Sequence, residues 1–102
     1  MPRTDAFQVT PLEREVLCQA LPWYIKLPNA DDRPRAERLL GHVQTRGSRL
    51  DLSAEDAKLL VGVLQQHDRY GPDLPPAQSN ALWALMARFD KMHEVLSGGI
   101  FG

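Results

Sequence analysis

Residues 10–21 have the sequence TPLEREVLCQAL, and this stretch decides the fold class of the chain. The hydroxyl of Thr10 can cap a helix, Pro11 suits the first helical position, and Glu13 completes a Thr-x-x-Glu capping box. Apolar residues follow at the three- and four-residue steps of one helical face, namely Leu12, Val16, Leu17, Ala20 and Leu21. The stretch therefore predicts an amphipathic helix that begins at Pro11.

This first predicted helix meets a proline at position 22. Pro22 has no N–H and crowds the carbonyl of Cys18, so we expect the helix to end near Leu21 or to kink there. Residues 23–27 are apolar enough to continue the packing, and they are counted with this helix.

The same start and stop signals predict three more helices. Asp31 or Asp32 can cap one helix, which stops at Gly47, and Ser53 can cap the next. A fourth begins near Pro76 and ends at a pair of glycines. The four predicted helices span about residues 11–27, 33–46, 54–70 and 76–97.

No segment alternates apolar and polar side chains convincingly, which is the signal of a half-buried strand. We therefore predict an all-α fold without a sheet: a compact four-helix unit built from two helical hairpins. Residues 10–97 are predicted to form a single domain, preceded by an N-terminal arm over residues 1–9. Residues 98–102 are predicted to form a C-terminal tail.

Shifting the sequence on itself by 43 residues aligns the two predicted hairpins. The caps Thr10 and Ser53 then coincide, Glu13 falls on Asp56, and the inward apolar positions superimpose. This pattern is typical of an internal duplication, in which neither copy can bury its apolar face alone. Between residues 7–43 and 50–86 only three positions are identical, and any two amphipathic hairpins align after a suitable shift, so both interpretations stay open.

Composition places the chain among ordinary globular proteins. It has 102 residues, enough for one domain, with 43 % apolar and 25 % charged residues. Its one cysteine, Cys18, excludes an internal disulfide. The apolar runs are too short to span a membrane, and the first residues lack the apolar segment of a secretory signal. We therefore expect a cytoplasmic protein with no membrane partner.

Charge is distributed unevenly along the chain. Residues 33–49 hold five arginines against one glutamate, whereas the net charge of the whole chain is −1. Steps of three and four place four basic residues on one face of the predicted second helix, namely Arg35, Arg38, His42 and Arg46. Guanidinium groups in a row suit phosphate oxygens, which makes this face a candidate for binding an anion, a nucleic acid or an acidic protein. The competing interpretation is a solvated face partly paired with nearby carboxylates.

Few residues suggest catalysis or metal binding. The one pair of metal-ligand type at helical spacing around a histidine is Asp90 and His93, which is too little for a metal site. Cys18 lies close to the inward face of its helix, where a small buried residue is expected. Thr10 and Ser53 are explained as helix caps. We therefore expect no catalytic residue, no metal and no cofactor.

Bulky side chains exceed what the core of a four-helix unit of this size can bury. Exposed aromatic groups mark association surfaces, and tryptophan and tyrosine dominate binding at many interfaces. The candidate interface residues are Trp23, Tyr24, Trp83, Met86 and Phe101. The sequence thus predicts a non-catalytic helical protein–protein interaction module that forms a homodimer, with anion or nucleic-acid binding by the arginine face as the alternative.

Overall fold

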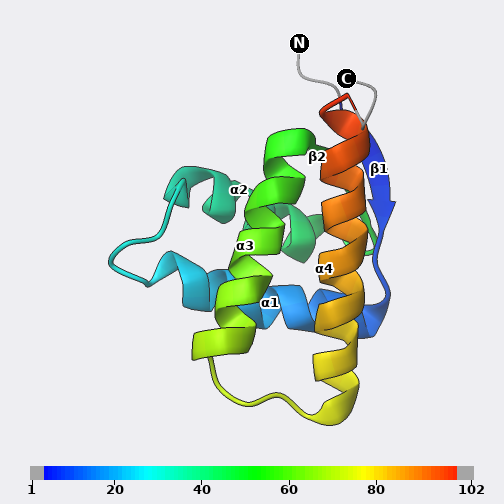
Figure 1. Cartoon of the computed structure of the whole chain (residues 1–102). Coiled ribbons are helices and arrows are strands. Elements are labelled where there is room, and N and C mark those ends of the chain that lie inside the picture. Colours follow the sequence, from blue (N-terminus) through cyan, green and yellow to red (C-terminus); the bar gives the residue numbers. More distant parts are fainter. Residues whose placement is uncertain (1–3, 99–102) are drawn as a thin grey trace.

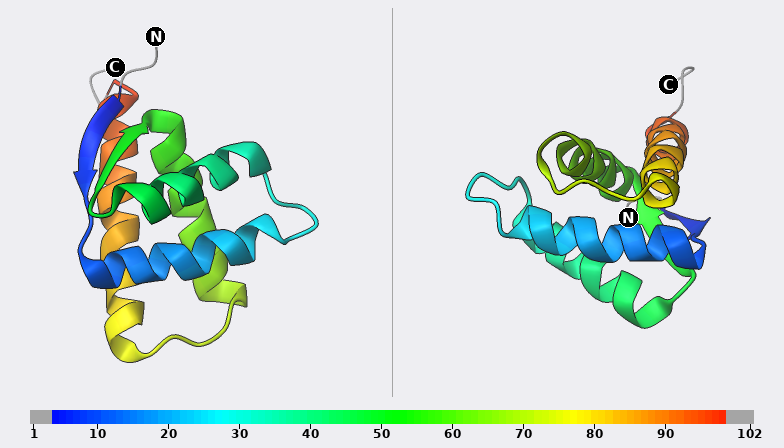
Figure 2. Two further views of the ribbon diagram at one scale, coloured as in Figure 1. Left: turned by 180° about the vertical axis from the view of Figure 1, so that it is seen from behind. Right: turned by 90° about the horizontal axis from the view of Figure 1, so that it is seen from below.

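The computed structural model describes residues 4–98, which form four helices and two short strands. The elements are β1 (Thr4–Gln8), α1 (Pro11–Ile25), α2 (Arg33–Arg46), β2 (Arg49–Ser53), α3 (Ala54–Tyr70) and α4 (Pro76–Leu96). Helices α3 and α4 lie side by side, and α1 and α2 form a second layer that crosses them (Figures 1 and 2). The four predicted helices are confirmed. None of the helices within residues 4–98 combines the length and apolar character that crossing a bilayer requires.

The prediction of a fold without a sheet is wrong, because β1 and β2 pair as a two-stranded antiparallel sheet. β1 lies within residues 1–9, where an arm was predicted. Each strand has only five residues, so the apolar alternation around Phe7 and Leu50 is too brief to identify a strand from sequence. The strands form because each satisfies the backbone of the other while Phe7, Leu50 and Leu52 enter the core.

The chain repeats the order strand, helix, helix. In the sheet, Phe7 lies opposite Leu50, and these are positions that the 43-residue shift aligns. An antiparallel pair has a local two-fold axis, and here it falls between equivalent positions. Both α1 and α3 also open with a complete capping box. The fold therefore supports the interpretation of two equivalent halves.

Arginines connect the two halves at their helix caps. The carboxylate of Glu13, in the cap of α1, accepts hydrogen bonds of 2.9 and 3.0 Å from Arg88 of α4. The carboxylate of Asp56, in the cap of α3, accepts bonds of 2.8 Å from Arg35 and 2.6 Å from Arg38, both on α2. Each cap acid thus binds arginine from the second helix of the other half.

Helix α1 continues past Pro22. Beyond the proline, Tyr24 is buried, and its hydroxyl donates to the Asp31 carbonyl at 2.9 Å and accepts the Asp31 N–H at 2.8 Å. Arg33 of α2 donates to the Ile25 carbonyl at 2.9 Å, which has no intrahelical partner at the end of the helix. These tertiary contacts hold the last turn of α1 in place.

Candidate functional site

The structure separates the predicted interface residues. Tyr24 is buried, and Trp23 is half-buried with its indole edge-on to the imidazole of His67, at 5.1 Å between ring centroids. Met86 is nearly buried, whereas the side chain of Trp83 is 54 % exposed. Phe101 lies outside the described residues. Of these candidates, Trp83 and Met86 line one common hollow.

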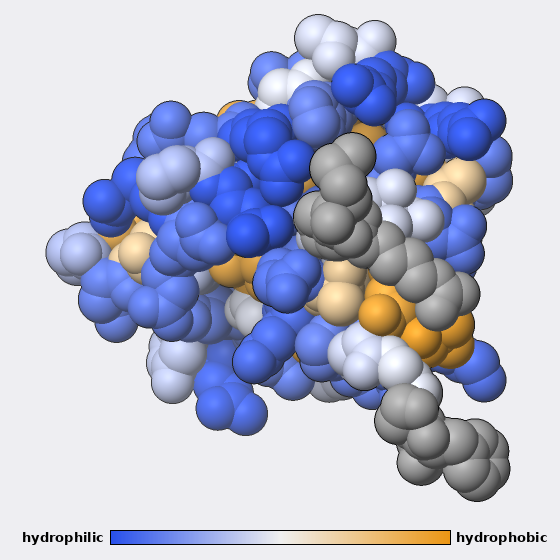
Figure 3. All heavy atoms as spheres, turned by 90° about the horizontal axis from the view of Figure 1, so that it is seen from above, coloured by the Kyte–Doolittle hydropathy of each residue, from blue (hydrophilic) through white to orange (hydrophobic). Residues whose placement is uncertain are grey.

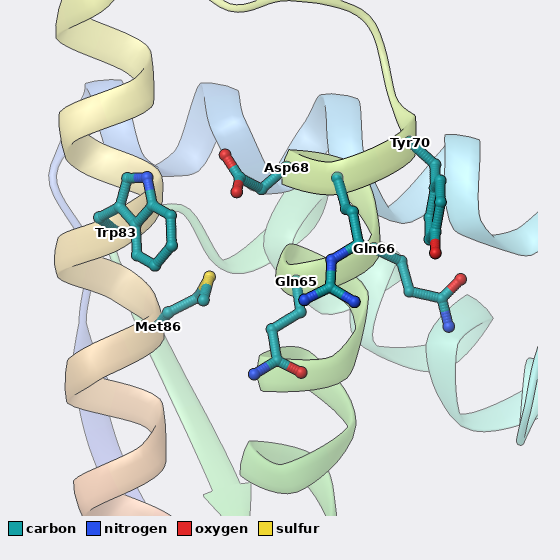
Figure 4. A pocket seen from close by; sticks show the side chains of 7 residues that line it. Gln65, Gln66, Asp68, Tyr70, Trp83 and Met86 are labelled. Atoms are coloured by element: carbon teal, nitrogen blue, oxygen red, sulfur yellow. The ribbon is translucent and has the colours of Figure 1, made fainter.

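This hollow lies between the second half of α3 and the first half of α4, and we call it the Trp83–Tyr70 face. Its volume is about 230 Å³. Its lining residues are Gln65, Gln66, Asp68, Arg69, Tyr70, Trp83 and Met86. Figure 4 shows the side chains of Trp83 and Met86 on α4 facing Gln65 and Asp68 on α3, with Tyr70 on the other side of the last turn of α3.

The Trp83–Tyr70 face combines accessible aromatic side chains with polar and charged ones. Tyr70 is 71 % exposed, so two large aromatic groups are accessible to a partner. Polar amides and the adjacent charges of Asp68 and Arg69 surround them. Within residues 4–98, neither of these two charges takes part in an ion pair. Accessible aromatic side chains, surrounded by polar groups and by charges without an ion-pair partner among the described residues, are features that a protein partner can bind.

His67 lies beneath this face and was not among the predicted site residues. Its side chain is 2 % exposed, and neither ring nitrogen has a hydrogen-bond partner among the described residues. Gly71 covers the ring so closely that a Cβ at this position would lie 2.7 Å from Nδ1 of His67. Burial lowers the pKa of His67, while Asp68 opposes the shift.

The 43-residue shift aligns His67 with Tyr24, which is the signal in the sequence that could have identified His67. The loop after α1 satisfies the buried Tyr24 hydroxyl through the backbone of Asp31. The equivalent loop after α3 supplies no such partner to His67 among the described residues. A buried polar ring without a partner costs stability, so this position calls for an explanation.

The structure pairs much of the predicted arginine face internally. Arg35 and Arg38 both bind Asp56, whose side chain is 3 % exposed. Arg46 lies 3.5 Å from Asp51. His42 is half-buried, and burial followed by the charges of Arg46 and Arg38 lowers its pKa. The four residues remain on one helix, and anion binding by this face stays a prediction.

A second, more apolar groove of about 450 Å³ lies between β1 and α4. Seen from the end of the molecule where α4 finishes, the surface is mostly hydrophilic, and the largest of its hydrophobic areas lies at one side (Figure 3). The free edge of β1 is partly blocked: the Asp5 carboxylate accepts the Ala6 N–H at 2.8 Å, and Arg88 donates to the Gln8 carbonyl at 2.6 Å. An added strand would have to displace both contacts.

Neither a group of metal-ligating side chains among the described residues nor a known relative identifies the function of this site. Within residues 4–98, no three His, Cys, Asp or Glu side chains are grouped so that they could hold a metal ion. The half-buried thiol of Cys18 on α1 is not part of a disulfide. Comparison with protein-family models, with characterised proteins and with solved structures finds no match to this chain.

Proposed function

We propose that this chain is a small non-catalytic association module that forms a homodimer through the Trp83–Tyr70 face. The exposure of Trp83 carries the proposal, because more than half of a large indole lies open on a face that also carries an accessible Tyr70. Tryptophan and tyrosine, together with arginine, are enriched among the residues that contribute most to binding at protein interfaces. This face is a better docking surface than the groove beside β1. It has a polar rim, whereas the free edge of β1 is partly blocked by the contacts of Asp5 and Arg88.

Charge complementarity supports a second copy of the chain as the partner. In a two-fold dimer the same patch meets itself, so that residue i contacts residue j and the reverse. Asp68 and Arg69 are neighbours of opposite sign on this face. A two-fold axis near them places Asp68 against the partner's Arg69 and the reverse, which forms two ion pairs from one patch. The net charge of −1 adds little repulsion between copies.

Replacing Trp83 with aspartate is expected to convert a dimer into a monomer. Removing a central tryptophan costs about 2 kcal/mol or more of binding free energy, roughly a 30-fold rise in Kd. Sedimentation equilibrium measures it: the wild type should sediment at twice the 11.5 kDa of one chain, and the variant at 11.5 kDa. Val95→Asp is the matched control, because Val95 is also exposed on α4 but lines the groove beside β1.

The charge pairing can be tested separately. Asp68→Arg places two like charges opposite the partner's Arg69 and should weaken the dimer, and Arg69→Asp should do the same. The double variant restores opposite charges and should recover most of the affinity, because the patch again complements itself. A wild type that stays monomeric at high micromolar concentration would refute the proposal, as would a Trp83→Asp variant that dimerises normally.

A further inference from the structure

We infer that proton uptake by His67 regulates the Trp83–Tyr70 face: the protonated ring leaves its buried position beneath Gly71, the last turn of α3 opens, and the homodimer dissociates. The inference rests on the proposed dimer. His67 lies on α3 between Gln66 and Asp68, which both line the face. A change in the position of the ring therefore acts directly on the residues that the partner would contact.

The surroundings of His67 accept the neutral ring but not the charged one. An imidazolium has two N–H donors, and both ring nitrogens are buried without an acceptor among the described residues. From α1 the ring meets the indole of Trp23, and from the loop after α3 it meets the backbone of Gly71. Asp68, on α3 itself, is the charged group that acts on the ring, and its negative charge favours the protonated form. An unpaired buried charge is costly, so protonation drives the ring toward water.

The contacts of His67 also explain which part of the fold would open. The Gly71 N–H donates to the His67 carbonyl at 3.0 Å and closes the end of α3. Because the backbone of Gly71 is close to both this carbonyl and the ring, we expect the ring to leave only when the last turn moves. That turn carries Asp68, Arg69 and Tyr70, which supply the charge pair and one aromatic group of the face.

The sign of the pH dependence follows from the lowered pKa of His67. The closed state binds the proton less tightly than an open state with an ordinary pKa of about 6.5. Closure is therefore fully favoured above about pH 6.5 and is lost progressively as the pH falls below that value. Asp56 does not interfere in this range, because its pKa lies below its ordinary value and it stays ionised.

The experiment measures dimer Kd by sedimentation equilibrium at pH 7.5 and pH 5.5 for the wild type, His67→Phe and His67→Leu. We expect the wild-type Kd to rise about tenfold or more on acidification. Both substitutions remove the titrating group and keep an apolar side chain against Trp23, so their Kd should stay nearly constant. His42→Gln is the control, because it removes another histidine with a lowered pKa and should leave the wild-type response intact. Equal acid dissociation in wild type and both His67 variants would overturn the inference while the dimer stands.

A second readout separates failure of the switch from failure of the dimer. In Trp83→Asp, nuclear magnetic resonance follows the His67 ring and the Gly71 amide during titration. The expected result is a His67 transition below pH 6.5 with simultaneous loss of amide protection at Gly71. A ring that titrates without any change at Gly71 or Tyr70 overturns the switch. If the wild type forms no dimer at any pH, both the proposed function and its regulation are refuted, even where the last turn of α3 opens in the monomer.

Discussion

Replacing Asp56 with alanine is expected to destabilise the fold by about 3 kcal/mol or more, which is a large fraction of the stability of a domain of this size. The Asp56 carboxylate accepts the Ser53 N–H at 3.0 Å as well as the bonds from Arg35 and Arg38. The substitution removes one of the two hydrogen bonds of the α3 capping box and leaves two guanidinium groups beside a buried site. Urea unfolding followed by circular dichroism measures the change.

Asp32→Asn is the matched control for this experiment, because asparagine tolerates the left-handed backbone of Asp32 at φ 46° and removes only the charge. Asp32 binds the same guanidinium of Arg35 at 2.7 Å, but its side chain is 48 % exposed. An exposed ion pair contributes about 1 kcal/mol or less, so the control should lose little stability. Equal losses for Asp32→Asn and Asp56→Ala would contradict the idea that Asp56 connects the two halves of the fold.

The lowered pKa of Asp56 predicts a separate loss of stability at acid pH. Burial disfavours its carboxylate, but the Ser53 N–H and the two arginines outweigh this effect and lower the pKa. A carboxylate with a lowered pKa stabilises the fold above its ordinary pKa of about 3.9 and loses that contribution as the pH falls further. The His67 effect falls in a higher pH range, so the two transitions can be distinguished.

Replacing Phe89 with alanine is expected to cost about 3 to 5 kcal/mol of unfolding free energy, the usual cost of truncating a buried aromatic side chain. Phe89 on α4 is fully buried and stacks on Phe7 with 4.4 Å between ring centroids. Because Phe7 lies on β1, this aromatic pair joins β1 to α4. The Arg88 guanidinium, also on α4, lies 4.3 Å from the centroid of the Phe7 ring. Urea unfolding of the single and double alanine variants measures the coupling between the two rings, which should be about 1 kcal/mol.

Trp83→Ala provides the comparison on the same helix. Trp83 is exposed, so its truncation should change the stability of the monomer by less than about 1 kcal/mol while weakening association. A large loss of monomer stability for Trp83→Ala would show that the indole acts as a core residue. That outcome would remove the main support for the homodimer.

Local signals explain why the helices were predictable. The capping boxes of α1 and α3 each join residues three apart, and the apolar steps of three and four recur within each helix. These patterns depend only on neighbours along the chain, so the starts of α1 and α3 could be read directly. The 43-residue shift likewise placed Phe7 on Leu50, although the sequence did not reveal that the two residues face each other across a sheet.

The candidate site was only partly predictable, because burial and hydrogen-bond partners depend on contacts that local sequence patterns do not reveal. Trp83 and Met86 were identified by their type and position, and they do line a common surface. Tyr24 was also proposed, but the backbone of Asp31, in the loop that follows α1, satisfies its hydroxyl in the interior. His67 was passed over, because burial without a partner is a property of its surroundings and not of its neighbours in sequence.

The amino-acid sequence by itself determined the number of helices, their caps and their apolar faces, because each of these needs contacts only a few residues apart. The tertiary structure alone decided that residues 4–8 pair with residues 49–53, that Arg35 and Arg38 meet at Asp56, and that one indole stays outside. These outcomes depend on which distant surfaces come together when the two halves pack. Packing selects among many compatible arrangements, and local patterns do not distinguish them.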